Sequence, residues 1–266
     1  MTMSPFALIS PSTRGLSLAL TRHLLRTTDL TVFATHRSDS PDAVRRNILS
    51  PLPHVDANRL RLLHCELTSE DSIAAAAQDL ADALGSDADG GAHLDTAFFA
   101  GGILNPERQP ADLDASTVEK TFQINVISHL LLIKHFSRFL PPPSSTSSKA
   151  KSSSTTKWVH VSARVGSVSD NRLGGWYSYR ASKAALNQVI RTFDLYLQQK
   201  KIPAMCVGVH PGTVKTDLSR VFWDGVPENK LFEPDFAAER IVDVVRDLDS
   251  KSRGRVWDWA GKEVVP

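Results

Sequence analysis

The sequence contains only two cysteines among 266 residues, Cys65 and Cys206, and each lies among apolar residues. Two isolated thiols make neither a disulfide framework nor a cysteine-based metal cluster, so we expect both in the core, in a reducing compartment. No apolar run approaches the ~20 residues that span a bilayer, and the first residues lack the pattern of a signal peptide. These absences predict a soluble, cytoplasmic protein with no membrane partner.

An excess of charge of one sign is also lacking, because 31 lysines and arginines face 29 aspartates and glutamates, for a net charge of +2. A nucleic-acid-binding surface concentrates positive charge and often interleaves aromatic residues with it. Neither pattern occurs here, and we therefore expect no nucleic-acid partner. The 41% hydrophobic content supports a sizeable core, and we expect one domain over residues 1–266.

Short apolar segments alternate with segments of helical periodicity along the chain. The predicted strands are 6–10, 30–35, 60–65, 94–100, 157–162 and 204–210. The predicted helices include 15–26, 69–84, 117–140 and 180–200. Apolar strands separated by helices predict an α/β fold with a doubly wound parallel sheet, in which ligands bind beyond the carboxyl ends of the strands.

One segment, 141–157, interrupts this pattern because it consists almost entirely of proline, serine, threonine and lysine. Such a composition buries too little apolar surface to offset the entropy of ordering it. We expect a flexible surface insertion between a helix and the next strand. A phosphorylated or partner-binding segment is the alternative.

The first predicted strand is followed by the stretch SPSTRGLSLAL, in which Gly15 opens a helix. A dinucleotide-binding turn uses glycines at this place and offers the N–H groups of the helix to phosphate. Only one glycine is present. Taken alone, an ordinary turn between strand and helix explains the stretch equally well.

Farther along, Tyr179 and Lys183 have the spacing Y-x-x-x-K, which places both on one face of a helix. This pair, the turn at Gly15 and the order of strands together resemble the short-chain dehydrogenase/reductase superfamily in its single-domain, Rossmann-like form. The resemblance covers everything except 141–157. The first turn of that family is T-G-x-x-x-G-x-G, and Pro11 and Ser17 stand where two of its glycines are expected. We therefore expect a rearranged loop and weaker cofactor affinity.

The resemblance also bears on the choice of cofactor. Members that prefer NAD place an acidic residue after the second strand, where it binds the ribose hydroxyls. Here Thr35, His36 and Arg37 occupy that place. Arg37 and Arg14 are suited to pair with a 2′-phosphate, so we expect NADP(H). Two solvated surface arginines remain the alternative.

The resemblance distributes the predicted cofactor contacts over the carboxyl ends of several strands. They are Arg14, Gly15, Leu16, His36, Arg37, Glu66, Leu67, Ala100, Gly101, Asn125, Tyr179, Lys183, Val214 and Thr216. Phe99 replaces the asparagine of the family's N-A-G motif and is expected to pack in the core.

The predicted catalytic residues are Tyr179, Lys183, Asn125 and Ser162. The resemblance makes Tyr179 the general acid and base of hydride transfer between NADP(H) and a small-molecule carbonyl or alcohol substrate. A tyrosine of ordinary pKa near 10 is a poor proton carrier at neutral pH, so we expect the Lys183 ammonium and the nicotinamide charge to lower it. Lys183 is also expected to donate to the nicotinamide ribose, and Asn125 to hold a water in a proton relay.

The carbonyl-polarising serine of the family falls on Ala163 in this chain. Ser162, or alternatively Ser167, would have to replace it, and without either the enzyme would be slow. The resemblance further implies a substrate lid at 217–234 and a homo-oligomer. The departures at Pro11, Ser17, Phe99 and Ala163 support a rival reading, a catalytically impaired protein that acts as a nucleotide-binding sensor or assembly subunit.

Overall fold

The computed structural model describes residues 5–38, 40–85, 92–143 and 155–266. Its main sheet has the order β10-β9-β6-β5-β4-β1-β2-β3, and every neighbouring pair is parallel except β9 with β10. The strands of this sheet are β1 Phe6–Ser10, β2 Thr31–His36, β3 Leu60–His64, β4 Leu94–Phe99, β5 Thr156–Val161, β6 Ala204–His210, β9 Val256–Asp258 and β10 Glu263–Val264. The predicted doubly wound α/β fold is confirmed.

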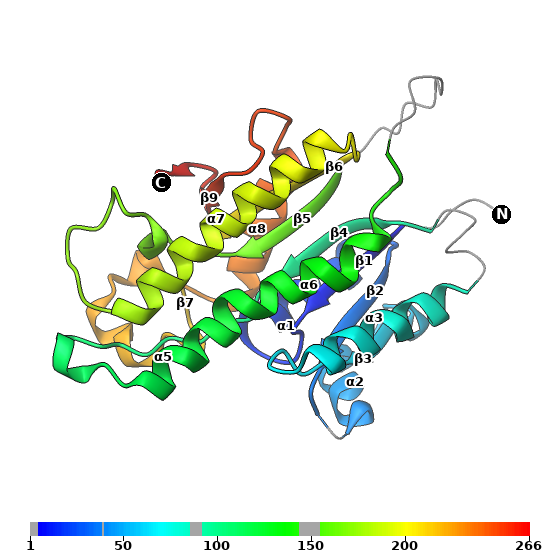
Figure 1. Ribbon diagram of the computed structural model, residues 1–266. Helices are drawn as coiled ribbons and strands as arrows, with labels where there is room; N and C mark the ends of the chain where they lie inside the picture. The colour runs from blue at the N-terminus through cyan, green and yellow to red at the C-terminus, as the bar shows by residue number, and fades with distance from the viewer. Residues whose placement is uncertain (1–4, 39, 86–91, 144–154) are drawn as a thin grey trace.

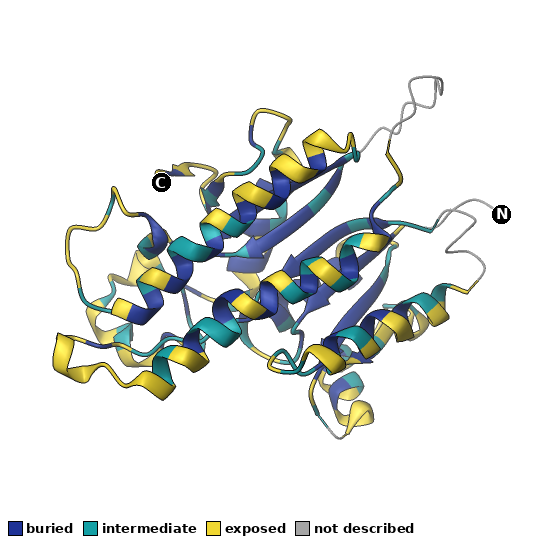
Figure 2. Cartoon of the chain, in the orientation of Figure 1, coloured by how far each residue is buried: buried dark blue, intermediate teal, exposed yellow. Residues whose placement is uncertain are grey.

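Helices cover both faces of the sheet (Figure 1). On one face lie α1 Gly15–Thr27, α2 Pro41–Leu49 and α8 Pro234–Asp247; on the other lie α3 Glu70–Leu84, α6 Ser128–Phe136 and α7 Tyr177–Gln199, with α5 Ala115–Phe122 leading into α6. Because side chains of a strand alternate between faces, Ala7 and Ile9 of β1 join one hydrophobic core while Phe6 and Leu8 join the other. Figure 2 shows the sheet buried between these two layers.

The order of the strands reverses between β1 and β4, whose connections leave in opposite directions. In a doubly wound sheet this switch point opens a crevice beyond the carboxyl ends of the strands. The turn after β1, the segment after β4 and the end of β5 therefore lie around one opening, which is where the predicted site residues are found.

The predicted strands agree with the observed ones to within a residue, but two predicted segments need correction. The predicted helix 117–140 is divided into α5, a π-helical turn at Gln123–Ile127 and α6. The predicted insertion 141–157 extends too far, because Thr156 and Lys157 belong to β5, where the buried Thr156 hydroxyl donates to the carbonyl of Leu94. Residues 144–154 of that insertion lie outside the described residues.

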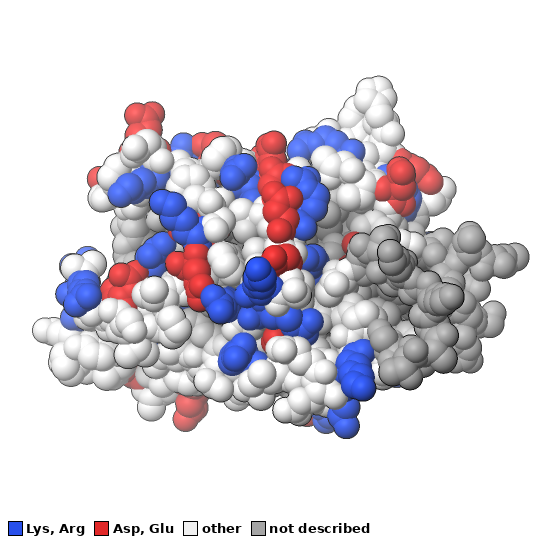
Figure 3. Space-filling model, turned by 90° about the horizontal axis from the view of Figure 1, so that it is seen from above, with Lys and Arg blue, Asp and Glu red and all other residues white. Residues whose placement is uncertain are grey.

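Both cysteines are free and buried, as expected. In the described ranges no helix has the length and apolarity needed to cross a bilayer. On the face of the molecule seen in Figure 3, lysine and arginine side chains are interspersed with aspartate and glutamate.

A buried carboxylate ties α7 to the C-terminal part of the sheet. Asp194 is fully buried; it accepts hydrogen bonds from the backbone N–H of Cys206 at 3.0 Å and from Gln198 at 2.7 Å, and it pairs with Arg253 at 3.1 Å. Arg253 also donates to the carbonyl of Ala204 at 2.8 Å. Three segments of the chain, α7, β6 and the loop that carries Arg253, therefore meet at this buried carboxylate.

We predict that Asp194→Ala lowers the free energy of unfolding by about 3–5 kcal/mol, because it leaves the Arg253 charge and a buried N–H without their partner. Urea denaturation measures this. Arg246→Ala, which breaks an exposed pair with Asp243, is the control and should change stability little. Equal effects of the two substitutions would contradict the assignment.

Candidate active site

The turn after β1 holds three of the predicted cofactor residues, Arg14, Gly15 and Leu16, and brings Gly15 close to a fourth, Thr216, from a distant segment. Gly15 opens α1 with a φ of +55°, and a Cβ placed on it would lie 3.0 Å from Cγ2 of Thr216. Arg14 is exposed at the N-cap, whereas Leu16 is buried in the core beneath the turn. The first turn of α1 contains no acidic residue. A free helix N-terminus with this composition is suited to an anion.

The residues predicted for the adenosine side also lie together. Arg37 pairs with Glu66 at 3.5 Å, and Glu66 accepts two hydrogen bonds from Thr68. Burial acts to raise the pKa of Glu66, but the hydrogen bonds from Thr68 and the Arg37 charge together lower it. His36 is buried at the end of β2, with its ring Nδ1 3.1 Å from the carbonyl oxygen of Ser38.

The segment after β4, residues 100–103, runs along the opening. The N–H of Ala100 donates to the carbonyl of Ser10 at 2.8 Å. Gly101 packs so closely that an added Cβ would lie 2.6 Å from Cδ1 of Leu67. A Cβ on Gly102 would lie 3.6 Å from both the Asn125 amide oxygen and the Lys183 ammonium. This segment therefore separates the predicted adenosine residues from the predicted catalytic ones.

Asn125 is fully buried in the π-helical turn between α5 and α6. Its amide oxygen accepts from the N–H of Ile103 at 2.8 Å, and its amide nitrogen donates to the carbonyl of Ile103 at 2.9 Å and to the Ser182 hydroxyl at 3.0 Å. The Ser182 hydroxyl donates in turn to the carbonyl of Tyr179 at 2.8 Å. Asn125 thus links the 100–103 segment to α7.

Tyr179 and Lys183 lie one turn apart on the buried face of α7. The Lys183 ammonium donates to the carbonyl of Val161, at the end of β5, at 2.9 Å and lies 5.8 Å from the centre of the Tyr179 ring. Burial lowers the pKa of Lys183 to about 8. The Lys183 ammonium therefore gives up its proton more readily than an exposed lysine does.

Burial raises the pKa of Tyr179 to about 12. The sequence predicted a lowering by the Lys183 ammonium together with the nicotinamide charge, and in this structure Lys183 does not supply its part. The reason is geometric: the ammonium lies over the ring and is hydrogen-bonded to Val161, while in the described part of the chain the phenol hydroxyl has no hydrogen-bond partner. In this structure Tyr179 is a protonated phenol at neutral pH.

The two candidate serines are both hydrogen-bonded elsewhere. Ser162 donates to the side-chain oxygen of Asn187 at 2.6 Å, and Ser167 donates to the carbonyl of Pro266 at 3.1 Å. Ala163, where the resemblance places the family's serine, follows β5. The loop after it is pressed against α7, because a Cβ on Gly166 would lie 2.7 Å from the carbonyl carbon of Lys183. The catalytic role of Ser162 stays a prediction.

The predicted lid, 217–234, contains two short 3₁₀ helices and the strand β8 Leu231–Phe232, which pairs with β7 Thr213–Val214. Val214 lies opposite Phe232 in this pair. The ring of Phe222 lies 4.7 Å from that of Trp176, which in turn lies 6.2 Å from the ring of Tyr179. The segment is thus connected to Tyr179 of α7 through aromatic contacts; its function as a lid stays a prediction.

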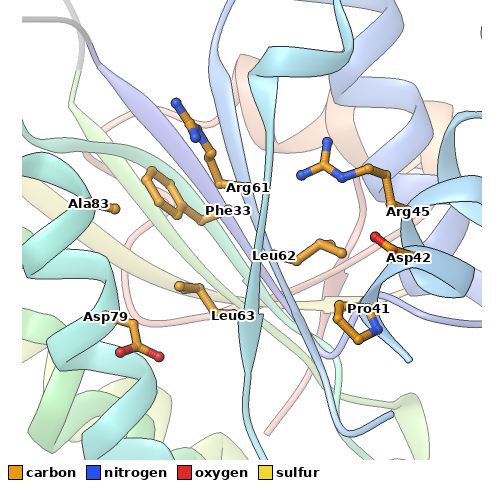
Figure 4. A pocket seen from close by; sticks show the side chains of 9 residues that line it. All are labelled: Phe33, Pro41, Asp42, Arg45, Arg61, Leu62, Leu63, Asp79 and Ala83. Carbon is orange, nitrogen blue, oxygen red and sulfur yellow. The ribbon is translucent and has the colours of Figure 1, made fainter. Parts of the chain in front are cut away.

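A separate hollow lies around the edge strand β3 (Figure 4). It is lined by Phe33, Pro41, Asp42, Arg45, Arg61, Leu62, Leu63, Asp79 and Ala83. None of these residues belongs to the predicted site. The hollow flanks the middle of the edge strand, away from the carboxyl ends where ligands of such sheets bind, and we assign no function to it.

Sequence reasoning missed three buried polar residues that surround the site, Ser182, His129 and His160. His129 lies four residues after Asn125, so helical spacing places it on the same face. His160 alternates with Val161 in β5. The spacing from Asn125 could have placed His129 on the buried face of the helix. The hydrogen bond between His129 and His160 could not be predicted, because it depends on how α6 packs against β5.

Comparison with known proteins identifies the class. A family model described as short chain dehydrogenase matches residues 5–226. The chain is 30% identical to the short chain dehydrogenase gsfK of Penicillium aethiopicum, covering 99% of this chain and 100% of that protein. It is 29% identical to the 1-hydroxy-2-glutathionyl-2-methyl-3-butene dehydrogenase of Rhodococcus sp. strain AD45, covering 71% of this chain and 73% of that one.

Among solved structures, the NADPH-bound carbonyl reductase from chicken fatty liver superposes with a TM-score of 0.80 and 26% identity, covering 100% of both chains. The chain therefore belongs to the short-chain dehydrogenase/reductase family of oxidoreductases.

The lowered pKa of Lys183 predicts a pH-dependent stability. Between pH 8 and pH 10 the folded chain has released this proton while the unfolded chain, at an ordinary value of 10.5, still holds it, so stability rises with pH. Wild type should gain about 2 kcal/mol relative to Lys183→Met between pH 7 and pH 10. Urea denaturation of both proteins at the two pH values measures the gain. A difference that does not change with pH would contradict a buried ammonium.

Proposed function

We propose that the protein transfers a hydride between NADP(H) and a small-molecule carbonyl or alcohol, with Tyr179 as the general acid and base. One observation carries the proposal: Lys183, on the buried face of α7 with Tyr179, and Asn125 converge on Gly102 at the carboxyl ends of β4 and β5. Three residues far apart in the sequence meet there, and the crevice of a doubly wound sheet is where a dinucleotide binds.

The residues around the opening fit a dinucleotide. Gly15 and Gly101 bring backbone so close to Thr216 and Leu67 that an added Cβ would lie 3.0 Å and 2.6 Å from their side chains. At Gly102 an added Cβ would be in ordinary contact, 3.6 Å from the Lys183 ammonium. The N-terminus of α1, free of acidic residues, suits the pyrophosphate. The exposed Arg14 and Arg37 suit a 2′-phosphate, although Glu66 competes for Arg37. The related chicken reductase was solved with NADPH.

When bound, NADPH supplies the hydride of the reduction. Tyr179 gives its proton to the oxygen of the carbonyl as negative charge develops there. A raised pKa keeps this phenol protonated at neutral pH, which favours reduction, whereas oxidation needs the phenolate and is favoured by alkaline pH. The Lys183 ammonium lies over the ring of Tyr179. Asn125 holds the 100–103 segment in place and is our candidate to hold a relay water.

A second function is favoured by one specific observation. Ala163 occupies the position of the carbonyl-polarising serine, and both nearby serines are hydrogen-bonded to other partners. A chain without that donor suits a nucleotide-binding sensor or an assembly subunit. Turnover distinguishes the two functions, because a reductase and a sensor would both bind cofactor but only the reductase would reduce a substrate.

Partner and location are also proposed here. Four apolar or aromatic side chains are 39–46% exposed: Ile127 just before α6, Leu130 within it, and Leu195 and Tyr196 on α7. Their exposure supports a homo-oligomer formed through these helices. A cytoplasmic location is supported by two free, buried cysteines.

We predict that Tyr179→Phe lowers kcat for NADPH-dependent reduction of a mixed panel of aldehydes and ketones at least 100-fold, because it removes only the proton donor. The affinity for NADPH, measured by energy transfer from tryptophan, should stay within about threefold of wild type on the same reasoning. Running the panel with NADH tests the cofactor preference. Equal rates in both proteins would remove Tyr179 from the mechanism.

Ala163→Ser should restore a donor to the developing alkoxide and raise kcat by about 10- to 100-fold, somewhat less than a preorganised oxyanion donor contributes. Ala163→Cys is the control, because it is similar in size but a weak hydrogen-bond donor. Steady-state rates with saturating NADPH measure the difference. Cofactor binding without turnover in wild type and in both variants would favour the sensor instead.

A further inference from the structure

A continuous chain of hydrogen bonds runs from the core of the sheet to the 100–103 segment. The indole N–H of Trp158 donates to Nε2 of His160 at 2.9 Å. Nδ1 of His160 lies 2.8 Å from Nδ1 of His129, and Nε2 of His129 lies 3.0 Å from the carbonyl oxygen of Gly101. All three side chains are fully buried. None of them has a part in the chemistry proposed above.

The groups at the two ends of this series of hydrogen bonds determine which ring nitrogen of each histidine carries the proton. An indole nitrogen can only donate and a carbonyl oxygen can only accept. His160 therefore accepts at Nε2 and carries its proton on Nδ1, which it donates to Nδ1 of His129. His129 must then carry its proton on Nε2, which it donates to Gly101. One arrangement satisfies every group, and a further proton on either ring would set two N–H groups against each other.

The other groups that face the pair agree with neutral rings. Burial lowers the pKa of His129 to about 3 and places that of His160 well below its usual value, and the Lys183 ammonium acts in the same direction on both. The chain ends at an indole in the core, which does not carry protons onward. It is thus a fixed connection, and it does not form a proton relay.

The hydrogen bond between His129 and Gly101 adds a third point at which the 100–103 segment is held to the rest of the fold. Ala100 is held by Ser10 and Ile103 by Asn125, so the bond from His129 is the one that holds the carbonyl of Gly101 between them. Phe99, directly before this segment, has no side-chain hydrogen-bonding group, and its ring packs 4.6 Å from that of Trp158 and 5.3 Å from that of His160.

We infer that His129 and His160, backed by Trp158, form a positioning device for the 100–103 segment. The device acts through the backbone carbonyl of Gly101, so both histidines are positioning residues. That this segment borders the cofactor rests on the proposed function; that the histidines hold it does not.

The test compares three variants in α6. His129→Leu removes the bond to Gly101, His129→Gln keeps a donor and an acceptor at similar reach, and Leu132→Ala damages the same buried helix one turn farther on without touching the segment. Hydrogen–deuterium exchange of a peptide spanning residues 98–106, in protein without cofactor, reports the attachment. Tryptophan energy transfer to NADPH and steady-state kinetics report its consequence.

We expect His129→Leu to speed exchange in that peptide at least 10-fold, with Leu132→Ala near wild type and His129→Gln within about threefold of it. The KM for NADPH should rise about 10-fold in His129→Leu while kcat at saturation changes less than threefold, because a misplaced segment weakens binding and leaves the proton donor in place. Exchange in His129→Leu no faster than in Leu132→Ala would overturn the inference. If wild type binds no NADPH, the proposed function fails, and the exchange comparison still decides the inference.

Discussion

The site depends on the contact between the end of β5 and the buried face of α7. Lys183 donates its hydrogen bond to the carbonyl of Val161, and Gly166 allows the loop after β5 to lie against the backbone of Lys183. Burying an ammonium is costly, and its hydrogen bond to the carbonyl of Val161 offsets part of that cost. The lowered pKa of Lys183 reflects the part that remains. The same contact sets where the phenol of Tyr179 lies, one turn away.

Around this contact the chain departs from its family at several positions, and the structure accommodates each departure differently. Pro11 packs beside the 100–103 segment, 3.7 Å from where a Cβ of Gly101 would lie. Phe99 packs its ring against Trp158, and His129 forms a hydrogen bond with the carbonyl of Gly101 in the segment that follows. Ala163 has no such replacement among the serines near it, since Ser162 and Ser167 are used elsewhere. The departures at Pro11 and Phe99 are thus accommodated by packing, whereas neither Ser162 nor Ser167 takes the place of a serine at Ala163.

Local sequence pattern predicted the parallel sheet and its strands well, because their apolar runs are read from neighbouring residues alone. It also placed Tyr179, Lys183 and Asn125 on elements that meet. It did not predict the division of the long helix at Gln123–Ile127, which depends on Asn125 reaching Ile103 in another segment. Nor did it predict the raised pKa of Tyr179, which follows from burial and from where the ammonium lies. Both are consequences of packing between distant parts of the chain.

The most direct test of the central claim is a crystal structure of the protein with NADP⁺. The account predicts the nicotinamide in the opening bordered by Tyr179, Lys183 and the 100–103 segment, with the pyrophosphate at the N-terminus of α1. A dinucleotide bound elsewhere, for example in the hollow beside β3, or a nicotinamide out of reach of the Tyr179 hydroxyl would contradict it.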